Sequence, residues 1–192
     1  MQIQVYHLLE RTKMAGPGQR FCIWVQGCNR HCTGCMAEET WSHDGGNAMS
    51  TDVLWEKIIN TCDIEGITFL GGEPLEQPEA VAALAEQAQA TGLSVVIFTG
   101  FTYKELLADV DPNIHRLLSS ADLLIDGPFM QEQFDLSRPW VGSLNQQFNF
   151  LTDRYNYDDL SGIQNQIEIR IDKNGKTLIN GMGDFSKIRK LL

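Results

Sequence analysis

The sequence has no long apolar run, no internal repeat and no excess of basic residues. No window approaches the roughly 20 apolar residues that a membrane-spanning helix needs. Only 15 lysines and arginines stand against 25 aspartates and glutamates, a net charge of −10, whereas domains that bind nucleic-acid phosphates usually carry a basic patch. We therefore expect neither a membrane nor a nucleic-acid partner. The acidity serves either solubility alone or a partner with a basic surface.

The amino terminus lacks the features of a secretory signal. Met1–Leu9 is interrupted by His7 and followed by Glu10, with no basic stretch before an apolar segment. We expect a cytoplasmic protein, in which disulfides are rare. The five cysteines are an odd number, and three of them lie within Cys28–Cys35. Such crowding in a reducing compartment indicates metal binding or catalysis.

The length of 192 residues suits one domain with a single core. No linker-like stretch divides the chain, so we expect one domain over residues 1–192. The recognisable motifs occupy about residues 14–151, and residues 152–192 form a less regular C-terminal part.

Short apolar runs alternate with helical patterns, as in a parallel sheet whose strands are connected by helices. The predicted strands are Phe21–Gln26, Ile67–Leu70, Leu93–Thr99, Leu123–Asp126 and Phe148–Leu151, and Asn174–Gly175 between Ile167–Ile171 and Thr177–Ile179 predicts a hairpin. The predicted helices begin near Ser50, Pro78, Thr102 and Asp111.

The number of these units limits the fold. A complete eight-stranded α/β barrel typically needs about 250 residues, more than this chain has. We therefore predict an α/β fold, a partial, open-sided (β/α) barrel with about six βα units. A doubly wound sheet is the alternative, and hydrophobic periodicity does not separate the two.

The central motif is Cys28-Asn29-Arg30-His31-Cys32-Thr33-Gly34-Cys35, a C-x3-C-x2-C spacing directly after a predicted strand. Three thiolates on one loop can bind three irons of a cubane cluster and leave the fourth iron without a protein ligand. An open coordination position distinguishes catalytic from closed structural metal centres. The carboxyl end of a strand is also where α/β folds place their active sites.

Two other interpretations of the cysteines stay open. A structural zinc site would take a fourth ligand from His31, His43, Cys22 or Cys62, and unliganded structural cysteines are the third alternative. Cys22 lies in a predicted strand and Cys62 ends an amphipathic helix. We interpret these two cysteines as small buried hydrophobic residues.

Several further segments accompany the cysteine motif. They are Gly16-Pro17-Gly18-Gln19-Arg20, Trp24-Val25-Gln26-Gly27-Cys28, Glu39-Thr40-Trp41, Gly71-Gly72-Glu73-Pro74, Thr99-Gly100-Phe101, Leu124-Ile125-Asp126-Gly127-Pro128-Phe129 and Gly142-Ser143-Leu144-Asn145-Gln146. Together the set resembles the radical-SAM superfamily and, within it, the glycyl-radical activating enzymes. The resemblance covers about Met14 to Leu151 and is strongest to the activases of anaerobic ribonucleotide reductases.

The resemblance implies a [4Fe–4S] cluster on Cys28, Cys32 and Cys35, with S-adenosylmethionine (SAM) as the second cofactor. In this family the reduced cluster passes one electron to SAM, and the resulting 5′-deoxyadenosyl radical removes a hydrogen atom from a glycine Cα of a partner protein. The protein orients these groups and excludes side reactions.

The implied partners are a large glycyl-radical enzyme, in first place an anaerobic ribonucleotide reductase, and an electron donor similar to flavodoxin or ferredoxin. The alternatives within the enzyme class are activation of another glycyl-radical enzyme and radical modification of a peptide. The alternative from another class is a zinc-binding interaction module without catalysis.

Six further residues are the candidate cofactor-binding residues: Gly71, Gly72, Glu73, Thr99, Asp126 and Asn145. The two glycines permit a sharp turn and a close approach to a ligand, and the resemblance implies that this segment receives the SAM ammonium, with Glu73 or nearby carbonyls as acceptors. Asp126 could accept hydrogen bonds from the ribose hydroxyls. Asn145 and the adjacent Gln146 have the amide chemistry for an adenine or methionine contact. An ordinary turn or loop role is the alternative for each.

Four positions depart from the family pattern. Gly34 stands where many superfamily members carry an aromatic residue, and Met36 where histidine or tyrosine is frequent. Ala15 replaces an acidic residue, and Gln147 stands where arginine often follows Asn-Gln. The latter two changes bear on the identity of the partner more than on the SAM chemistry.

Overall fold

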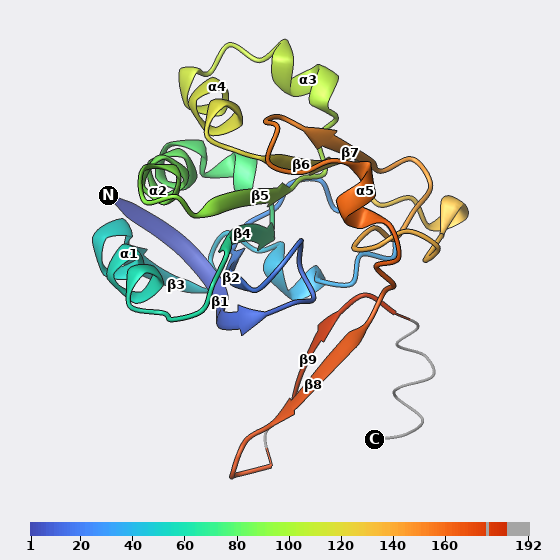
Figure 1. Cartoon of the computed structure of the whole chain (residues 1–192), viewed down its shortest axis with the longest axis horizontal. Helices are drawn as coiled ribbons and strands as arrows, with labels where there is room; N and C mark the ends of the chain where they lie inside the picture. The colour runs from blue at the N-terminus through green and yellow to red at the C-terminus, as the bar shows by residue number, and fades with distance from the viewer. Residues whose placement is uncertain (176, 184–192) are drawn as a thin grey trace.

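The computed structural model describes residues 1–175 and 177–183. A sheet in the order β3-β1-β2-β4-β5-β6-β7 forms its centre (Figure 1). Its strands are β1 (Gln2–Thr12), β2 (Arg20–Val25), β3 (Asn47–Ser50), β4 (Gly66–Gly71), β5 (Ser94–Phe98), β6 (Leu123–Asp126) and β7 (Gln147–Phe150). The neighbours β2, β4, β5 and β6 run parallel, whereas β1, β3 and β7 pair antiparallel.

The described helices are α1 (Thr51–Ile59), α2 (Pro78–Ala90), α3 (Tyr103–Leu107), α4 (Pro112–Ser119) and α5 (Tyr157–Leu160), with short 3-10 helices η1 (Glu38–Thr40), η2 (Pro74–Glu76) and η3 (Gln131–Gln133). Four of them, α1 to α4, begin where the sequence predicts them, and α5 was not predicted. Ser50 and Asp111 cap α1 and α4 through their side chains, and Thr102 with Glu105 forms the predicted capping box of α3. In the described part of the chain, no helix is long and apolar enough to cross a bilayer.

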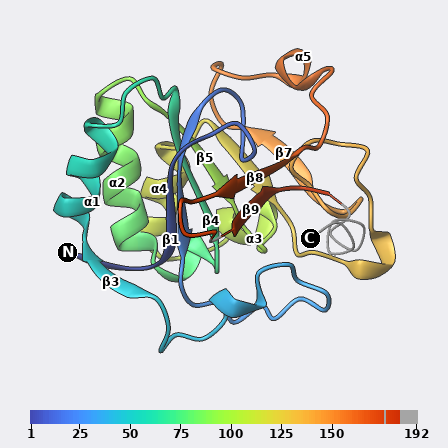
Figure 2. The same ribbon diagram turned by 90° about the horizontal axis from the view of Figure 1, so that it is seen from below.

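The helices α1, α2 and α4 pack on one face of the sheet (Figures 1 and 2). The side chains of alternate strand residues point to this face, among them Ile23, Phe69 and Ile97, and they meet apolar residues of the helices such as Leu54 and Leu84. Because consecutive strand residues point to opposite faces and both faces are covered, the parallel strands read as continuous apolar runs.

The opposite face has a different cover. Val96, Leu123 and Ile125 pack there against Trp140 and Val141 of the segment between β6 and β7, with α5 beside them. Among the residues that the structure describes, loops and short elements cover this face in place of a second helical layer, so the doubly wound alternative is not supported. The prediction of about six βα units is not confirmed, since four strands are parallel and three helical crossovers connect them.

The strands β1 and β3 were absent from the sequence-based prediction. The pairing of β1 with β2 shifts register between Val5 and His7 and again between Leu9 and Thr12. These irregularities break the alternation of apolar and polar residues by which a strand is predicted. Strand β3 has only four residues at the edge of the sheet, and two of them are exposed, so it carries almost no apolar signal.

Arg20 joins the amino ends of three strands. Its guanidinium is fully buried and donates to the Thr68 hydroxyl (3.0 Å) and to the side chain and carbonyl of Ser94. Tyr155, from the C-terminal part, lies 3.3 Å from the same group. Burial lowers the pKa of Arg20. All these partners are neutral, so the network holds the sheet to the C-terminal part without an ion pair.

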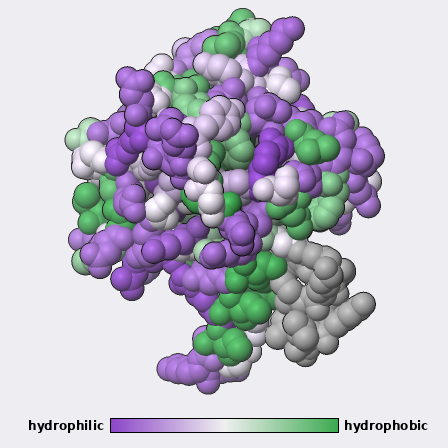
Figure 3. Space-filling view, turned by 45° about the vertical axis from the view of Figure 1, so that its right-hand side comes forward, coloured by the Kyte–Doolittle hydropathy of each residue, from purple (hydrophilic) through white to green (hydrophobic). Residues whose placement is uncertain are grey.

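The predicted hairpin is confirmed. Strands β8 (Ile167–Ile171) and β9 (Thr177–Gly181) pair antiparallel in a sheet of their own. One side of the hairpin contacts Thr12 of β1. The Thr12 hydroxyl donates a hydrogen bond to the Glu168 carboxylate and accepts one from the Asn180 amide. Ile169 and Ile171 are 43% and 66% exposed on the other side, and apolar surface gathers over the hairpin in Figure 3.

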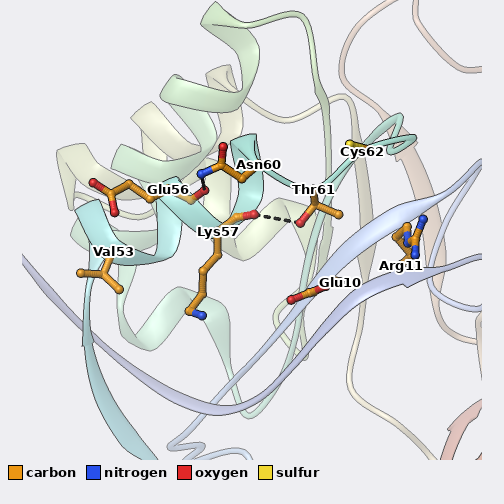
Figure 4. Close-up of a pocket in the computed structure, with 8 residues that line it drawn as sticks. All are labelled: Glu10, Arg11, Val53, Glu56, Lys57, Asn60, Thr61 and Cys62. Atoms are coloured by element: carbon orange, nitrogen blue, oxygen red, sulfur yellow. Dashed lines mark hydrogen bonds between the residues drawn. The ribbon is translucent and has the colours of Figure 1, made fainter.

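The two cysteines outside the motif differ in burial. Cys22 is fully buried against Leu9 and Ala15, as predicted, and burial raises the pKa of its thiol to about 12. The prediction of a buried Cys62 is wrong, because α1 ends at Ile59 and Cys62 lies exposed in the following turn. It lines a surface cavity of about 550 Å³ between α1 and β1 (Figure 4).

Candidate functional site

Most of the candidate residues lie at one edge of the sheet. Strands β2, β4, β5 and β6 are parallel neighbours, so their carboxyl ends lie side by side. The cysteine loop follows β2, Glu73 follows β4, Thr99 follows β5 and Asp126 ends β6. Asn145 joins them from the loop before β7, because its amide donates to the Pro128 carbonyl at 2.7 Å. The structure thus brings together residues that lie far apart in the sequence.

The Gly71–Gly72 pair lets the end of β4 pack closely against β2 and the start of the cysteine loop. Gly71 has a φ of +98°, and a Cβ there would lie 2.7 Å from the Trp24 Cα. A Cβ on Gly72 would lie 2.4 Å from the Gly27 carbonyl oxygen. The close approach that requires these glycines is therefore to the chain itself, and a ligand contact through them stays a prediction.

Glu73 is the more deeply buried of the two acidic groups at this edge, with 1% of its surface exposed against 5% for Asp126. Its backbone N–H donates to the Gly27 carbonyl at 2.8 Å, directly below the cysteine loop. Its carboxylate accepts hydrogen bonds from the Leu75 N–H (3.0 Å) and the Gly100 N–H (2.8 Å). Burial raises the pKa of Glu73 to about 7, against the opposing effect of these donors.

Thr99 supports Glu73. Its hydroxyl donates to the Glu73 carboxylate at 2.8 Å and accepts from the Phe101 N–H at 3.1 Å. The Thr99 hydroxyl therefore donates its proton to a hydrogen bond within the protein and not to a ligand. In this structure Thr99 orients the acidic group, while its predicted ligand role stays a prediction.

Asp126 and Asn145 each present one buried oxygen without a partner among the described residues. The Asp126 Oδ2 accepts from the Tyr103 N–H, whereas its Oδ1 is buried and unpaired. The Asn145 amide nitrogen is bonded to Pro128, but its Oδ1 is also buried and unpaired. Buried polar atoms are nearly always hydrogen-bonded, so these two acceptors fit a bound group with hydroxyl or amine donors.

The three cysteines of the loop differ in burial and in their backbone neighbours. Cys28 is buried at 8% exposure, while Cys32 and Cys35 are partly exposed. Burial raises the pKa of the Cys28 thiol, and the backbone N–H groups of Arg30 and His31 oppose this. The Ala37 N–H lies 3.4 Å from the Cys35 sulfur. Such N–H groups stabilise a thiolate, the form that binds iron.

The donor set fits an iron–sulfur cubane better than a single ion. Across the part of the chain that the structure describes, no three His, Cys, Asp or Glu side chains converge to hold one metal ion. A tetrahedral zinc site needs such convergence, whereas the three thiolates of a cubane bind three different irons. Of the proposed fourth zinc ligands, Cys22 is buried in β2 and Cys62 lies exposed after α1. His31 and His43 contact Trp41 and Glu76.

The sequence analysis did not predict the contacts between the residues inside the cysteine loop and the residues that hold them. Asn29, Arg30 and His31 stand at the variable positions of the spacing, and Glu76 lies in a turn with no motif of its own. Trp41 had a signal, since it belongs to a segment that resembles the activating enzymes. The two cavities of about 550 and 410 Å³ described here are lined by none of the three motif cysteines and none of the six candidate cofactor-binding residues.

The chain is similar to several known proteins. The model of a family described as 4Fe-4S single cluster domain matches residues 14–149. A protein named anaerobic ribonucleoside-triphosphate reductase-activating protein, from Vibrio cholerae, is 31% identical over 71% of this chain and 91% of its own length. Its namesake from Haemophilus influenzae is 35% identical over 68% and 87%. The solved structure of QueE from Escherichia coli aligns with a TM-score of 0.45 and 21% identity, over 53% of this chain and 54% of that one.

The raised pKa of Glu73 generates a prediction for stability. Between pH 4.5 and about 7 the folded protein keeps a proton that the unfolded chain releases. The free energy of unfolding from this group therefore falls as the pH rises through that range. Glu73→Gln should remove this fall, whereas Glu79→Gln, at an exposed position of α2, should retain it. Urea unfolding of the cluster-free protein across the range is the measurement, and an equal pH dependence in all three proteins would contradict the prediction.

Proposed function

The chain belongs to the family of anaerobic ribonucleoside-triphosphate reductase-activating proteins, and we propose that it generates a glycyl radical on such a reductase by radical-SAM chemistry. It contains a 4Fe-4S single cluster domain. The family resemblance and the iron–sulfur cluster predicted from the sequence are thereby confirmed. The observation that carries the proposal is the assembly of the three-cysteine loop, Glu73 and Asp126 at one edge of the sheet.

The cysteine loop is the proposed holder of the cluster. Cys28, Cys32 and Cys35 would bind three irons and leave one for SAM. When bound, the cluster would supply the one electron for the reductive cleavage of SAM. The protein must exclude water and hold both cofactors in contact geometry, because hydrogen-atom transfer needs near-touching atoms.

Glu73 is the proposed acceptor for the SAM ammonium. Its carboxylate lies behind the cysteine loop and is held by Thr99 and Gly100. A cation beside it favours the charged carboxylate and so lowers a pKa that burial raises to about 7. SAM binding should then release a proton from Glu73 below neutral pH. The unpaired oxygens of Asp126 and Asn145 are the proposed acceptors for ribose and adenine donors.

The shape of the sheet supports a protein substrate. We propose that the sheet is an incomplete radical-SAM barrel, because its long helices lie on one face and its edges, β3 and β7, are not paired with each other. Such an opening admits a glycine-bearing loop from a large partner, whereas enzymes with small substrates enclose most of their ligand. An electron donor similar to flavodoxin or ferredoxin belongs to the same proposal.

Replacing the motif cysteines tests the cluster. Cys28→Ala, Cys32→Ala and Cys35→Ala should each abolish the cluster and SAM cleavage, because a thiolate ligand is lost. Cys62→Ala is the matched control and should keep about four irons per chain after anaerobic reconstitution. Iron and sulfide analysis with electron paramagnetic resonance is the measurement. SAM cleavage by the triple variant would contradict the assignment, and a colourless wild type with stoichiometric zinc would favour the interaction module.

Asp126→Asn separates SAM binding from cluster binding. The amide can keep the bond to Tyr103, but it replaces the free Oδ1 acceptor by a donor. The variant should hold the cluster and bind SAM about ten-fold to a hundred-fold more weakly, the value of a hydrogen bond to a charged group. Asp52→Asn, in the first turn of α1, is the control. Unchanged SAM affinity in the Asp126 variant would return Asp126 to a turn role.

Isotope transfer identifies the partner. Reduced enzyme, SAM and reductase should yield 5′-deoxyadenosine together with a persistent glycyl-radical signal on the reductase. Deuterium at the Cα of the reductase's radical glycine should appear in the deoxyadenosine, because that hydrogen is transferred. Without the reductase, only slow uncoupled SAM cleavage is expected. Intact SAM cleavage without label transfer would reject this partner and favour another glycyl-radical enzyme or a peptide substrate.

A further inference from the structure

Each residue between Cys28 and Cys32 is tied to a different segment of the protein. Asn29 is held from the side of β4. Its backbone N–H donates to one oxygen of the Glu76 carboxylate at 2.7 Å, and its side-chain amide donates to the other at 2.9 Å. His43 lies 3.3 Å from the same carboxylate and from the Asn29 side chain. A single carboxylate of η2 thereby fixes the start of the loop.

Arg30 is held from the side of β5. Its guanidinium lies 4.6 Å from the centroid of the Phe101 ring, a cation–π contact. Its aliphatic part lies flat over Gly100, where a Cβ would come within 3.2 Å of the Arg30 Cγ. Gly100 is also the residue whose N–H bonds Glu73. The loop is therefore clamped to the same turn that orients the buried acid.

His31 is held from the downstream side of the loop. Its φ of +45° lies in the left-handed region, which costs about 1 kcal/mol or more for a residue other than glycine. Its ring stacks on Trp41 with a centroid distance of 4.6 Å and an angle of 27° between planes. The carbonyl of Trp41 also accepts the Cys28 N–H at 3.0 Å. Trp41 thus supports the strained residue and the first cysteine together.

These three contacts explain how the loop turns its backbone toward Cys28. The backbone N–H groups of Arg30 and His31 act on the Cys28 sulfur, in a stretch of chain where His31 has a φ of +45°. We propose that Glu76, Phe101 and Trp41 are positioning residues that hold Asn29, Arg30 and His31 so that the cysteine loop has its ligand-binding shape before iron arrives. The role in cluster binding rests on the proposed function, whereas the clamp itself is a property of the cluster-free chain.

Thiol labelling of the cluster-free protein tests the clamp without any cofactor. Glu76→Ala, Phe101→Leu and Trp41→Leu each remove one anchor and leave the loop sequence intact. Each should speed the labelling of the buried Cys28, and for Phe101→Leu the expected factor is about two to five, the range of one exposed cation–π contact. Site-resolved mass spectrometry reads the rates, with the exposed Cys62 as the internal standard. Glu79→Ala and Phe134→Leu, at exposed positions elsewhere, are the matched controls.

A double variant tests whether Arg30 acts through the ring. Arg30→Ala should speed labelling as much as Phe101→Leu does, and the double variant should add little to either. Labelling of Cys28 at the wild-type rate in all three anchor variants would overturn the proposal, as would equal acceleration in the controls.

Loss of the cluster to a chelator is the second measurement. In the reconstituted protein, the anchor variants should lose iron faster than wild type, in the same order as their labelling rates, with a factor of about two to five for Phe101→Leu. If the anchor variants label faster than wild type but the wild-type protein binds no iron, the clamp is upheld and the cluster function is rejected. A stable wild-type cluster with unchanged labelling and iron loss in every variant would reject the clamp and uphold the function.

Discussion

The buried carboxylate of Glu73 is the interaction on which the arrangement of the site depends. A carboxylate with 1% exposure is tolerated only where donors surround it. Those donors come from η2 and from the turn after β5, while its own N–H binds the base of the cysteine loop. One buried group therefore sets the relative positions of three strand ends, and the raised pKa of Glu73 shows that burial outweighs its donors.

The shape of the cysteine loop depends on contacts with residues that lie close to Glu73 and to the end of the loop. Gly72 brings β4 against Gly27 so closely that a Cβ would clash, and Glu76, Phe101 and Trp41 contact the residues between the first two cysteines. A loop with three thiols and no such support would sample many shapes, at an entropic cost when iron binds. The surrounding packing restricts the loop beforehand, which is how proteins hold a metal-binding group in place.

Prediction from the sequence worked where local signals were strong. Capping residues located the starts of α1, α3 and α4, and continuous apolar runs located β4, β5 and β6 because both of their faces are buried. It failed where tertiary contacts override local pattern. The bulged β1 lost its alternation, and Cys62 became exposed because α1 ended before it. The count of about six βα units is not confirmed, and one strand expected to continue the series, β7, is antiparallel.

The sequence by itself determined the family of this protein, because the spacing of the three thiols and the accompanying segments are the same in any fold. Only the tertiary structure decided the roles of the neighbours. Thr99 carries the same hydroxyl in any fold, but its contact with Glu73 exists only because β4 and β5 are adjacent and parallel. The anchors of Asn29, Arg30 and His31 likewise come from Glu76, Phe101 and Trp41, and such long-range contacts have no local pattern in the sequence from which they could be predicted.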